Sequence, residues 1–173
     1  AVLMSMFWAM KNIGMFDENK PGTNLLETGA HFYDVFECSD GKYVSIGSIE
    51  PQFYALLLEK TGLAEDPAFA KQMDASQWPT LKVKLADVMR TKTSTQWCKI
   101  MEGTDVCFAP VLTMSEAAAH PHNVACQTFI EIAGVTQPAP APRFSRTASA
   151  LPSAPAHAGQ HSRAVLADWG FDA

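Results

Sequence analysis

Glu50 is the acidic side chain whose setting best suits chemistry. It follows Gly47-Ser48-Ile49 and precedes Pro51, so we expect it to lie between a strand and a helix that begins at Pro51. The helix dipole favours an ionised carboxylate at that position by roughly 0.3–1 kcal/mol. Such a carboxylate can orient and polarise a histidine or act as a general base. The simpler alternative is that Glu50 only caps the helix.

His31 and Tyr33 are two residues apart in a β-rich run, so the pattern predicts that both side chains point to one face of a strand. His31 can shuttle a proton, or it can be a structural residue. Tyr33 can donate a hydrogen bond to a ligand oxygen, or it can be a partly buried strand aromatic.

Methionine is concentrated in the opening segment. Thioethers are flexible and polarisable, so they suit a surface that accepts apolar chains of variable shape, and they suit a gap-filling interface equally well. Half of the chain's eight methionines lie in the first fifteen residues: Met4, Met6, Met10 and Met15.

Other reactive residues form no recognised site. The four cysteines are irregularly spaced, and the His120/His122 pair has no third ligand nearby, which argues against a metal site. Arg143 and Arg146 can hold a phosphate or be solvated charges. The sequence contains no glycine-rich phosphate loop and no G-x-S-x-G motif.

The composition bounds the class of protein. The chain has 173 residues, 47% hydrophobic and 18% charged, with a formal net charge of −5. These values suit a globular domain and argue against wholesale binding to nucleic acid or an anionic membrane. The apolar opening run is too short for a membrane span and lacks signal-peptide features. We therefore expect reduced thiols and a cytoplasmic location.

Local patterns predict the elements that must position these residues. Residues 31–38 and 43–47 read as a β-hairpin around Asp40-Gly41. A helix is expected from Pro51 to Gly62 and another over 78–89, and Thr93 with Gln96 forms a capping box for a third. Further predictions follow along the chain: an edge strand over 106–112, a short helix capped by Ser115, a proline-rich extended stretch from Gln137, and a short helix over 162–170.

These elements predict an α+β fold, in which an antiparallel hairpin sheet packs with helices. We divide the chain into a methionine-rich helix and linker (1–29), a small α+β domain (30–112), a linker and proline-rich arm (113–159) and a C-terminal helix (160–173). A lone helix and a lone arm cannot bury their apolar faces, so we expect the chain to be part of a larger protein that supplies a partner domain or subunit.

The segment from Gly47 to Tyr54, Gly-Ser-Ile-Glu-Pro-Gln-Phe-Tyr, resembles the glutamate-bearing segment of α-methylacyl-CoA racemases, in the family III CoA-transferase (CaiB/BaiF) superfamily. Further matches to that family run in order along the chain, at 22–26, 29–33, 39–43, 103–107, 109–112, 140–145 and 161–170. The chain is similar to the C-terminal half of such an enzyme.

The resemblance implies an activity and a set of site residues. The racemases invert the configuration at the carbon α to a CoA thioester through an enolate-like intermediate, without a metal or redox cofactor. Members of the family form interlocked dimers with a large and a small domain. Glu50 matches the small-domain glutamate of the active-site network, and Tyr33 matches a tyrosine near the substrate. Met4, Met6, Met10 and Met15 fall where the racemases have a methionine-rich acyl-chain surface.

The family's catalytic histidine and aspartate lie upstream of the first residue of this chain, so the resemblance implies that the chain is inactive alone. Its expected partners are an acyl-CoA substrate and either a second subunit or an N-terminal large domain. Two alternatives stay open: part of a family III CoA transferase, or a non-catalytic CoA-binding or assembly module. Ile49-Glu50-Pro51 favours the racemase, because the transferases generally have a glycine-rich loop there.

Overall fold

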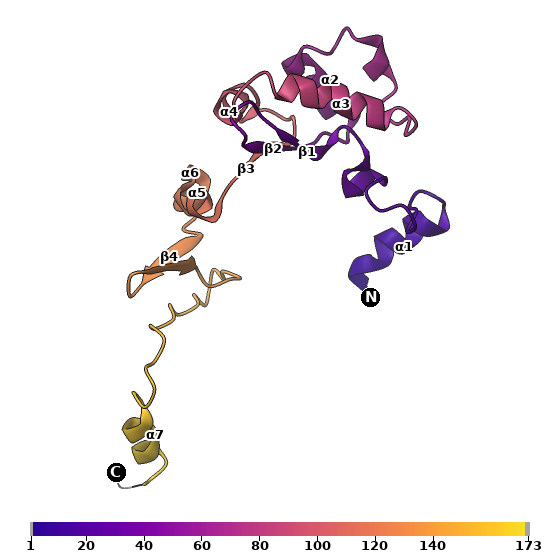
Figure 1. The fold of residues 1–173 in the computed structure, drawn as a ribbon. Coiled ribbons are helices and arrows are strands. Elements are labelled where there is room, and N and C mark those ends of the chain that lie inside the picture. Colours follow the sequence, from indigo (N-terminus) through magenta and orange to yellow (C-terminus); the bar gives the residue numbers. More distant parts are fainter. Residues whose placement is uncertain (1, 172–173) are drawn as a thin grey trace. The chain divides into compact units, whose positions relative to one another are not determined.

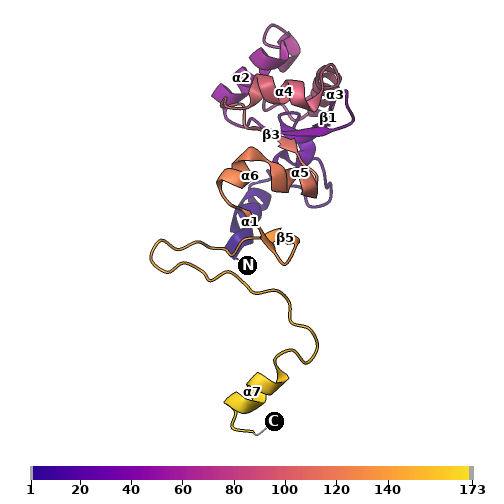
Figure 2. The same ribbon diagram turned by 90° about the vertical axis from the view of Figure 1, so that its left-hand side faces the viewer.

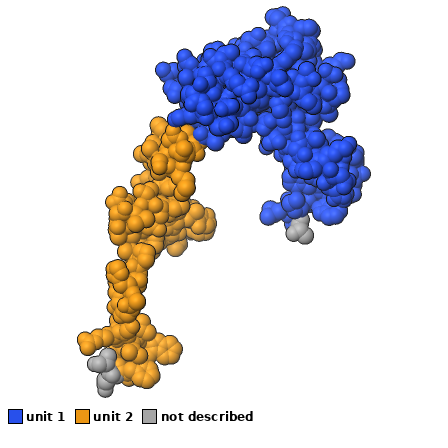
Figure 3. Space-filling model, in the orientation of Figure 1, with its two compact units in different colours: residues 1–111 blue, residues 112–173 orange. Residues whose placement is uncertain are grey.

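The computed structural model describes residues 2–171 and divides into two compact units, residues 1–111 (unit 1) and residues 112–173 (unit 2), drawn in blue and orange in Figure 3. Helices are combined with a three-stranded antiparallel sheet in unit 1 and with a two-stranded antiparallel sheet in unit 2. The predicted α+β class is therefore confirmed.

Unit 1 is built on a sheet with the order β1-β2-β3, formed by β1 (Tyr33–Glu37), β2 (Tyr43–Gly47) and β3 (Phe108–Val111). The predicted hairpin is confirmed: β1 and β2 pair with Tyr33 opposite Gly47, and Gly41 takes the positive φ of +71° that the turn requires. β3 lies at the sheet edge, where Pro110 is tolerated because that edge needs no further donor.

Three helices lie on one side of this sheet, as both ribbon views show (Figures 1 and 2): α2 (Pro51–Thr61), α3 (Trp78–Met89) and α4 (Ser94–Met101). A short 3-10 turn, η3 (Pro67–Ala70), links α2 to the segment before α3. Side chains alternate along the strands, so Phe36 and Val44 are buried while Val35 is 47% exposed. The core lies between helices and sheet and includes Phe32, Leu57, Leu81, Leu85, Met89, Trp97 and Met101.

The helix boundaries follow the predicted local signals. Pro51 is the first residue of α2, and Gly62 ends the helix in the left-handed conformation at φ +75°. The capping box of Thr93 and Gln96 is present at the start of α4.

The opening segment consists of the 3-10 turn η1 (Val2–Met4), α1 (Ser5–Asn12) and a one-turn segment, η2 (Leu25–Gly29). α1 has no buried residues. At Gly29 a Cβ would lie 2.3 Å from the backbone of Thr23, so only glycine fits where this segment turns into the residues before β1.

Unit 2 begins with two short helices, α5 (Met114–Ala119) and α6 (Pro121–Ala125). The prediction that Ser115 caps the first helix is wrong: Thr113 accepts the amide of Glu116 and forms a capping box with it, one residue before the helix begins. The chain does not leave helical structure at Pro121, because proline fits the first position of α6.

A second hairpin follows in unit 2, formed by β4 (Phe129–Ile132) and β5 (Val135–Pro138), and the sequence patterns had not indicated it. Ala133 and Gly134 both have positive φ, +52° and +78°, as a tight hairpin turn requires. The proline-rich extended stretch is predicted from Gln137, but Gln137 and Pro138 still belong to β5. Residues 139–161 contain no helix or strand, as predicted, and α7 covers Ser162–Asp168. Within residues 2–171, no helix has the length and apolar character needed to cross a membrane.

Candidate active site

Glu50 occupies the N-cap position of α2. Its backbone has extended angles (φ −70°, ψ 141°), and its carbonyl accepts hydrogen bonds from the amides of Tyr54 (2.9 Å) and Phe53 (3.0 Å). Its side chain makes no capping hydrogen bond and is exposed. The capping alternative is therefore wrong for the carboxylate, which remains available to a ligand or a partner group.

Tyr33 lines a hollow of about 400 Å³ on the face of the sheet that the helices leave open. Val35 of β1, Ser45 and Gly47 of β2, and Ala109 of β3 line the same hollow. The strand register explains this grouping, because Tyr33 pairs with Gly47, and Val35 pairs with Ser45, which pairs with Ala109. Tyr33 is half-buried, and among residues 2–171 its hydroxyl has no hydrogen-bond partner.

Cys107 is the residue of this hollow whose thiol lies within electrostatic range of Glu50. It lines the hollow beside Gly47, whose amide donates to the Cys107 carbonyl at 2.9 Å, and its backbone has a positive φ of +58°. Burial raises the pKa of its thiol, and the negative charges of Glu50 and Asp105 raise it further. The thiol is therefore held in its protonated form and is not an activated nucleophile. The sequence offered no signal that Glu50 and Cys107 lie near one another.

His31 does not belong to this hollow. The prediction that it shares a strand face with Tyr33 is wrong, because β1 begins only at Tyr33, whose amide bonds the Ala30 carbonyl in a turn. The imidazole is fully buried among the rings of Phe32, Tyr54 and Phe69. Burial lowers its pKa to about 4, and the nearby Lys82 charge acts in the same direction. His31 is a structural residue, not a proton shuttle.

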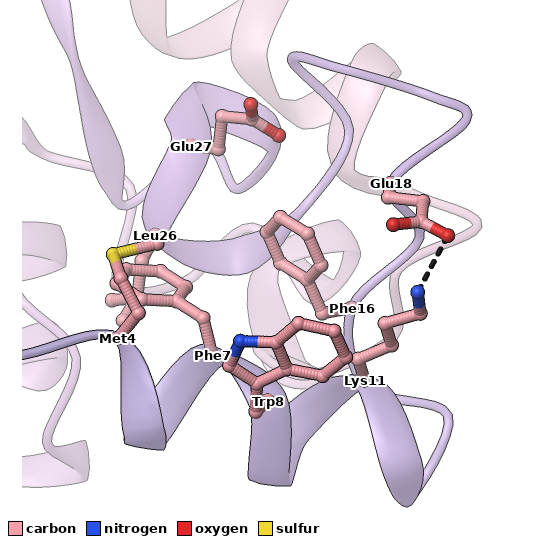
Figure 4. A pocket seen from close by; sticks show the side chains of 8 residues that line it. All are labelled: Met4, Phe7, Trp8, Lys11, Phe16, Glu18, Leu26 and Glu27. Carbon is pink, nitrogen blue, oxygen red and sulfur yellow. Dashed lines mark hydrogen bonds and ion pairs between the residues drawn. The ribbon is translucent and has the colours of Figure 1, made fainter. Parts of the chain in front are cut away.

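A second hollow, of about 450 Å³, lies against α1 within the opening segment (Figure 4). Of the four predicted methionines, Met4 lines this hollow. Met6 and Met15 are about half exposed and Met10 is half-buried, and none of these three lines it. Aromatic rings dominate the lining in Figure 4, which consists of Met4, Phe7, Trp8, Lys11, Phe16, Glu18, Leu26 and Glu27.

One ion pair borders this aromatic hollow. The ammonium of Lys11 lies 2.6 Å from the Glu18 carboxylate and 5.2 Å from the centre of the Trp8 ring. Phe7 and Phe16 meet edge to face at 5.8 Å between ring centres. Sequence reasoning missed the aromatic residues as site candidates, although Met4, Trp8 and Lys11 recur at helical spacing along the segment.

The remaining candidates have local roles. The Arg143 guanidinium donates to the carbonyls of Cys126 and Gln127, so it holds backbone within unit 2. No group of three or more histidine, cysteine or acidic side chains suited to a metal ion occurs among residues 2–171.

The sequence of the chain is similar to one known protein family and to characterised members of it. The model of CoA-transferase family III matches residues 1–162. The chain is 42% identical to mouse alpha-methylacyl-CoA racemase over 174 residues and 39% identical to the human enzyme over 175 residues. Each alignment covers 99% of this chain and 45% of the relative, so the chain spans less than half the length of these curated relatives.

The fold has relatives among solved structures. A CaiB/BaiF family protein from Brucella suis superposes with a TM-score of 0.68 at 21% identity, over 92% of this chain and 43% of that protein. The structure of Rv3272 from Mycobacterium tuberculosis gives a TM-score of 0.65 at 20% identity, over 92% of this chain and 41% of that one.

Proposed function

The chain belongs to CoA-transferase family III, and from that premise we propose that it is part of a 2-methylacyl-CoA racemase. The observation that carries the proposal is the identity of 39–42% to two alpha-methylacyl-CoA racemases across nearly the whole chain. The exposed Glu50 carboxylate at the start of α2, which no helix amide engages, supports it.

The proposed reaction is a proton exchange at carbon. A base removes the proton from the carbon α to the thioester, and the electron pair of the broken C–H bond moves into the carbonyl to give an enolate. A proton then returns to the opposite face of the same carbon. This chemistry needs bases on both faces and stabilisation of the enolate oxygen. It transfers no electrons to a carrier, and we propose that it uses no metal or redox cofactor.

We assign Glu50 the role of orienting and polarising a histidine that lies outside this chain. A carboxylate that accepts the imidazole N–H stabilises the imidazolium formed when the histidine takes the substrate proton. The family's histidine and aspartate would come from the rest of the polypeptide or from a second subunit. Tyr33 would donate its free hydroxyl to the substrate.

The aromatic hollow beside α1 would bind an apolar group. Its rings and the Met4 thioether suit an acyl chain, and the neighbouring Met6, Met10 and Met15 would extend that surface. The same surface would suit an interface with a second subunit or an N-terminal domain, and both uses are compatible.

Deuterium uptake at the α-carbon of a 2-methylacyl-CoA in D₂O tests the proposal, with mass spectrometry as the readout. The full-length protein that contains this chain is expected to catalyse the exchange, and the 173-residue chain alone is expected to catalyse none. Absence of exchange by the full-length protein would refute the racemase assignment, and robust exchange by the chain alone would refute the need for outside groups.

Two further measurements separate the alternatives. Formation of a new acyl-CoA from an added carboxylic acid would indicate a CoA transferase. Saturable binding of CoA by the isolated chain in calorimetry, with the chain a folded monomer in size-exclusion chromatography and no exchange activity in the full-length protein, would indicate a binding module.

A further inference from the structure

The loop that delivers Glu50 has its backbone groups held on several sides. The amide of Ser48 donates to the Phe32 carbonyl at 3.0 Å, and its hydroxyl donates to the Val106 carbonyl at 2.5 Å. The amide of Ile49 donates back to the Gly47 carbonyl at 2.9 Å. These contacts leave the carbonyl groups of Ser48 and Ile49, directly before Glu50, in need of donors.

Gln72 supplies both donors. Its Nε2 lies 3.1 Å from the Ser48 carbonyl oxygen and 2.9 Å from the Ile49 carbonyl oxygen. A side-chain amide carries two N–H groups, so one carboxamide can satisfy two successive carbonyls. The contact spans 23 residues of sequence, from the segment between η3 and α3 to the start of α2.

Gln72 is itself held in place. Its backbone carbonyl accepts a hydrogen bond from Nε1 of Trp78 at 2.9 Å. Trp78 is buried, and its ring meets that of Phe32 edge to face at 5.9 Å between centres. The carboxamide therefore extends from an anchored backbone, and its position is fixed from the hydrophobic core outwards.

We propose that Gln72 is a positioning residue for Glu50, because its carboxamide clamps the two peptide groups from which the Glu50 side chain emerges. The catalytic consequence rests on the function proposed for Glu50, whereas the clamp itself does not. Without the clamp, the carbonyls of Ser48 and Ile49 turn towards water and the carboxylate samples several positions.

The pKa of the Cys107 thiol allows the clamp to be tested without an activity assay. The negative charges of Glu50 and Asp105 raise the pKa of this thiol, so the pKa depends on where the Glu50 carboxylate lies. The rate of alkylation by iodoacetamide against pH, read for the Cys107 peptide by mass spectrometry, gives this pKa. Cys126, exposed in unit 2, is an internal control in the same sample.

The test compares the effect of Glu50→Gln in two backgrounds. In the wild-type chain this substitution should shift the pKa of Cys107 downwards, because it removes a negative charge that disfavours the thiolate. Gln72→Met keeps the length of the side chain and removes both N–H donors. In that background, the downward shift caused by Glu50→Gln should be smaller.

Gln77→Met is the matched control, because Gln77 is exposed and, among residues 2–171, its side-chain amide donates only to the Ser76 hydroxyl, at 3.4 Å. The effect of Glu50→Gln should be unchanged in that background. An equal effect with and without Gln72, or no effect of Glu50→Gln in the wild-type chain, overturns the proposal. If Gln72→Met does not fold, Gln72→Asn replaces it, since asparagine is one methylene too short to reach both carbonyls and should give the same result.

The second test measures the α-proton exchange activity of the full-length protein. Gln72→Met should lower kcat for α-proton exchange by about 10-fold to 100-fold, as expected when a group moves by about 1 Å, with KM nearly unchanged. An unchanged kcat would refute the catalytic role of the clamp. A wild-type protein without exchange activity would refute the racemase, while the thiol measurement would still decide whether Gln72 holds Glu50.

Discussion

The imidazole of His31 and the hydroxyl of Tyr54 form a buried hydrogen bond, with 2.8 Å between Nε2 and Oη. The Tyr54 hydroxyl donates its single hydrogen to the Phe69 carbonyl at 3.1 Å, so Nε2 of His31 must be the donor to Tyr54. Nδ1 is then an acceptor, and no group within residues 2–171 reaches it. The pair links the segment before β1 to α2, and so connects the two elements that carry Tyr33 and Glu50.

Tyr54→Phe should lower the free energy of unfolding by about 1–3 kcal/mol, because it leaves the Nε2 donor of His31 and the Phe69 carbonyl without partners in the core. Urea unfolding followed by circular dichroism measures the loss. Tyr43→Phe is the control, since Tyr43 is 45% exposed and should change stability by less than about 0.5 kcal/mol. Equal effects of the two substitutions would contradict the buried network.

The stability of the chain should fall as the pH drops from 6.5 towards 4. The pKa of His31 is about 4 in the folded chain, against 6.5 for an ordinary histidine. Between these values the unfolded chain binds more protons than the folded chain, so the contribution is complete above pH 6.5 and is lost as the pH falls. A complete loss corresponds to about 3 kcal/mol.

Urea unfolding at several pH values between 7 and 4.5 measures this dependence. His31→Gln removes the titrating group and should flatten the curve over that window, although it also lowers stability at every pH. A variant curve as steep as that of the wild type would assign the dependence to other groups.

Glu50→Gln should reduce α-proton exchange by the full-length protein by about 100-fold or more, within the range for removing a group from acid–base catalysis. Its unfolding free energy should change by less than about 0.5 kcal/mol, because the side chain is exposed and makes no capping bond. Glu65→Gln provides an exposed control in the loop between α2 and η3 and should retain activity. A large loss of stability in Glu50→Gln would show that the carboxylate has a structural role instead.

Trp8→Ala should raise KM for a long-chain 2-methylacyl-CoA by about 10-fold, equivalent to 1.4 kcal/mol of lost contact. Trp8 lines the aromatic hollow, whereas Ile13, at the end of α1 and 70% exposed, does not. Ile13→Ala should therefore leave KM unchanged. If both substitutions act equally, or if short and long acyl chains lose equally, the hollow does not receive the acyl chain.

Local sequence signals determined most of the elements that carry the site. Pro51 and Gly62 set the two ends of α2, Asp40-Gly41 sets the hairpin turn, and the Thr93/Gln96 box begins α4. Each of these signals acts through the dihedral angles or hydrogen bonds of residues a few positions apart, so it can be interpreted without knowledge of the rest of the chain. The N-cap position of Glu50 follows from the same kind of signal.

The environment of those residues was decided by tertiary structure. His31 and Tyr54 are 23 residues apart, as are Ile49 and Gln72, and Glu50 lies far along the chain from Cys107. Such contacts depend on which faces the sheet and helices bury together, and no local pattern specifies that. The sequence alone therefore identified Glu50 and Tyr33 as candidates. Only the tertiary structure buries His31 in the core and brings Gln72 to the carbonyls that precede Glu50. Burial and long-range hydrogen bonds arise only when elements distant in the sequence pack together and exclude water.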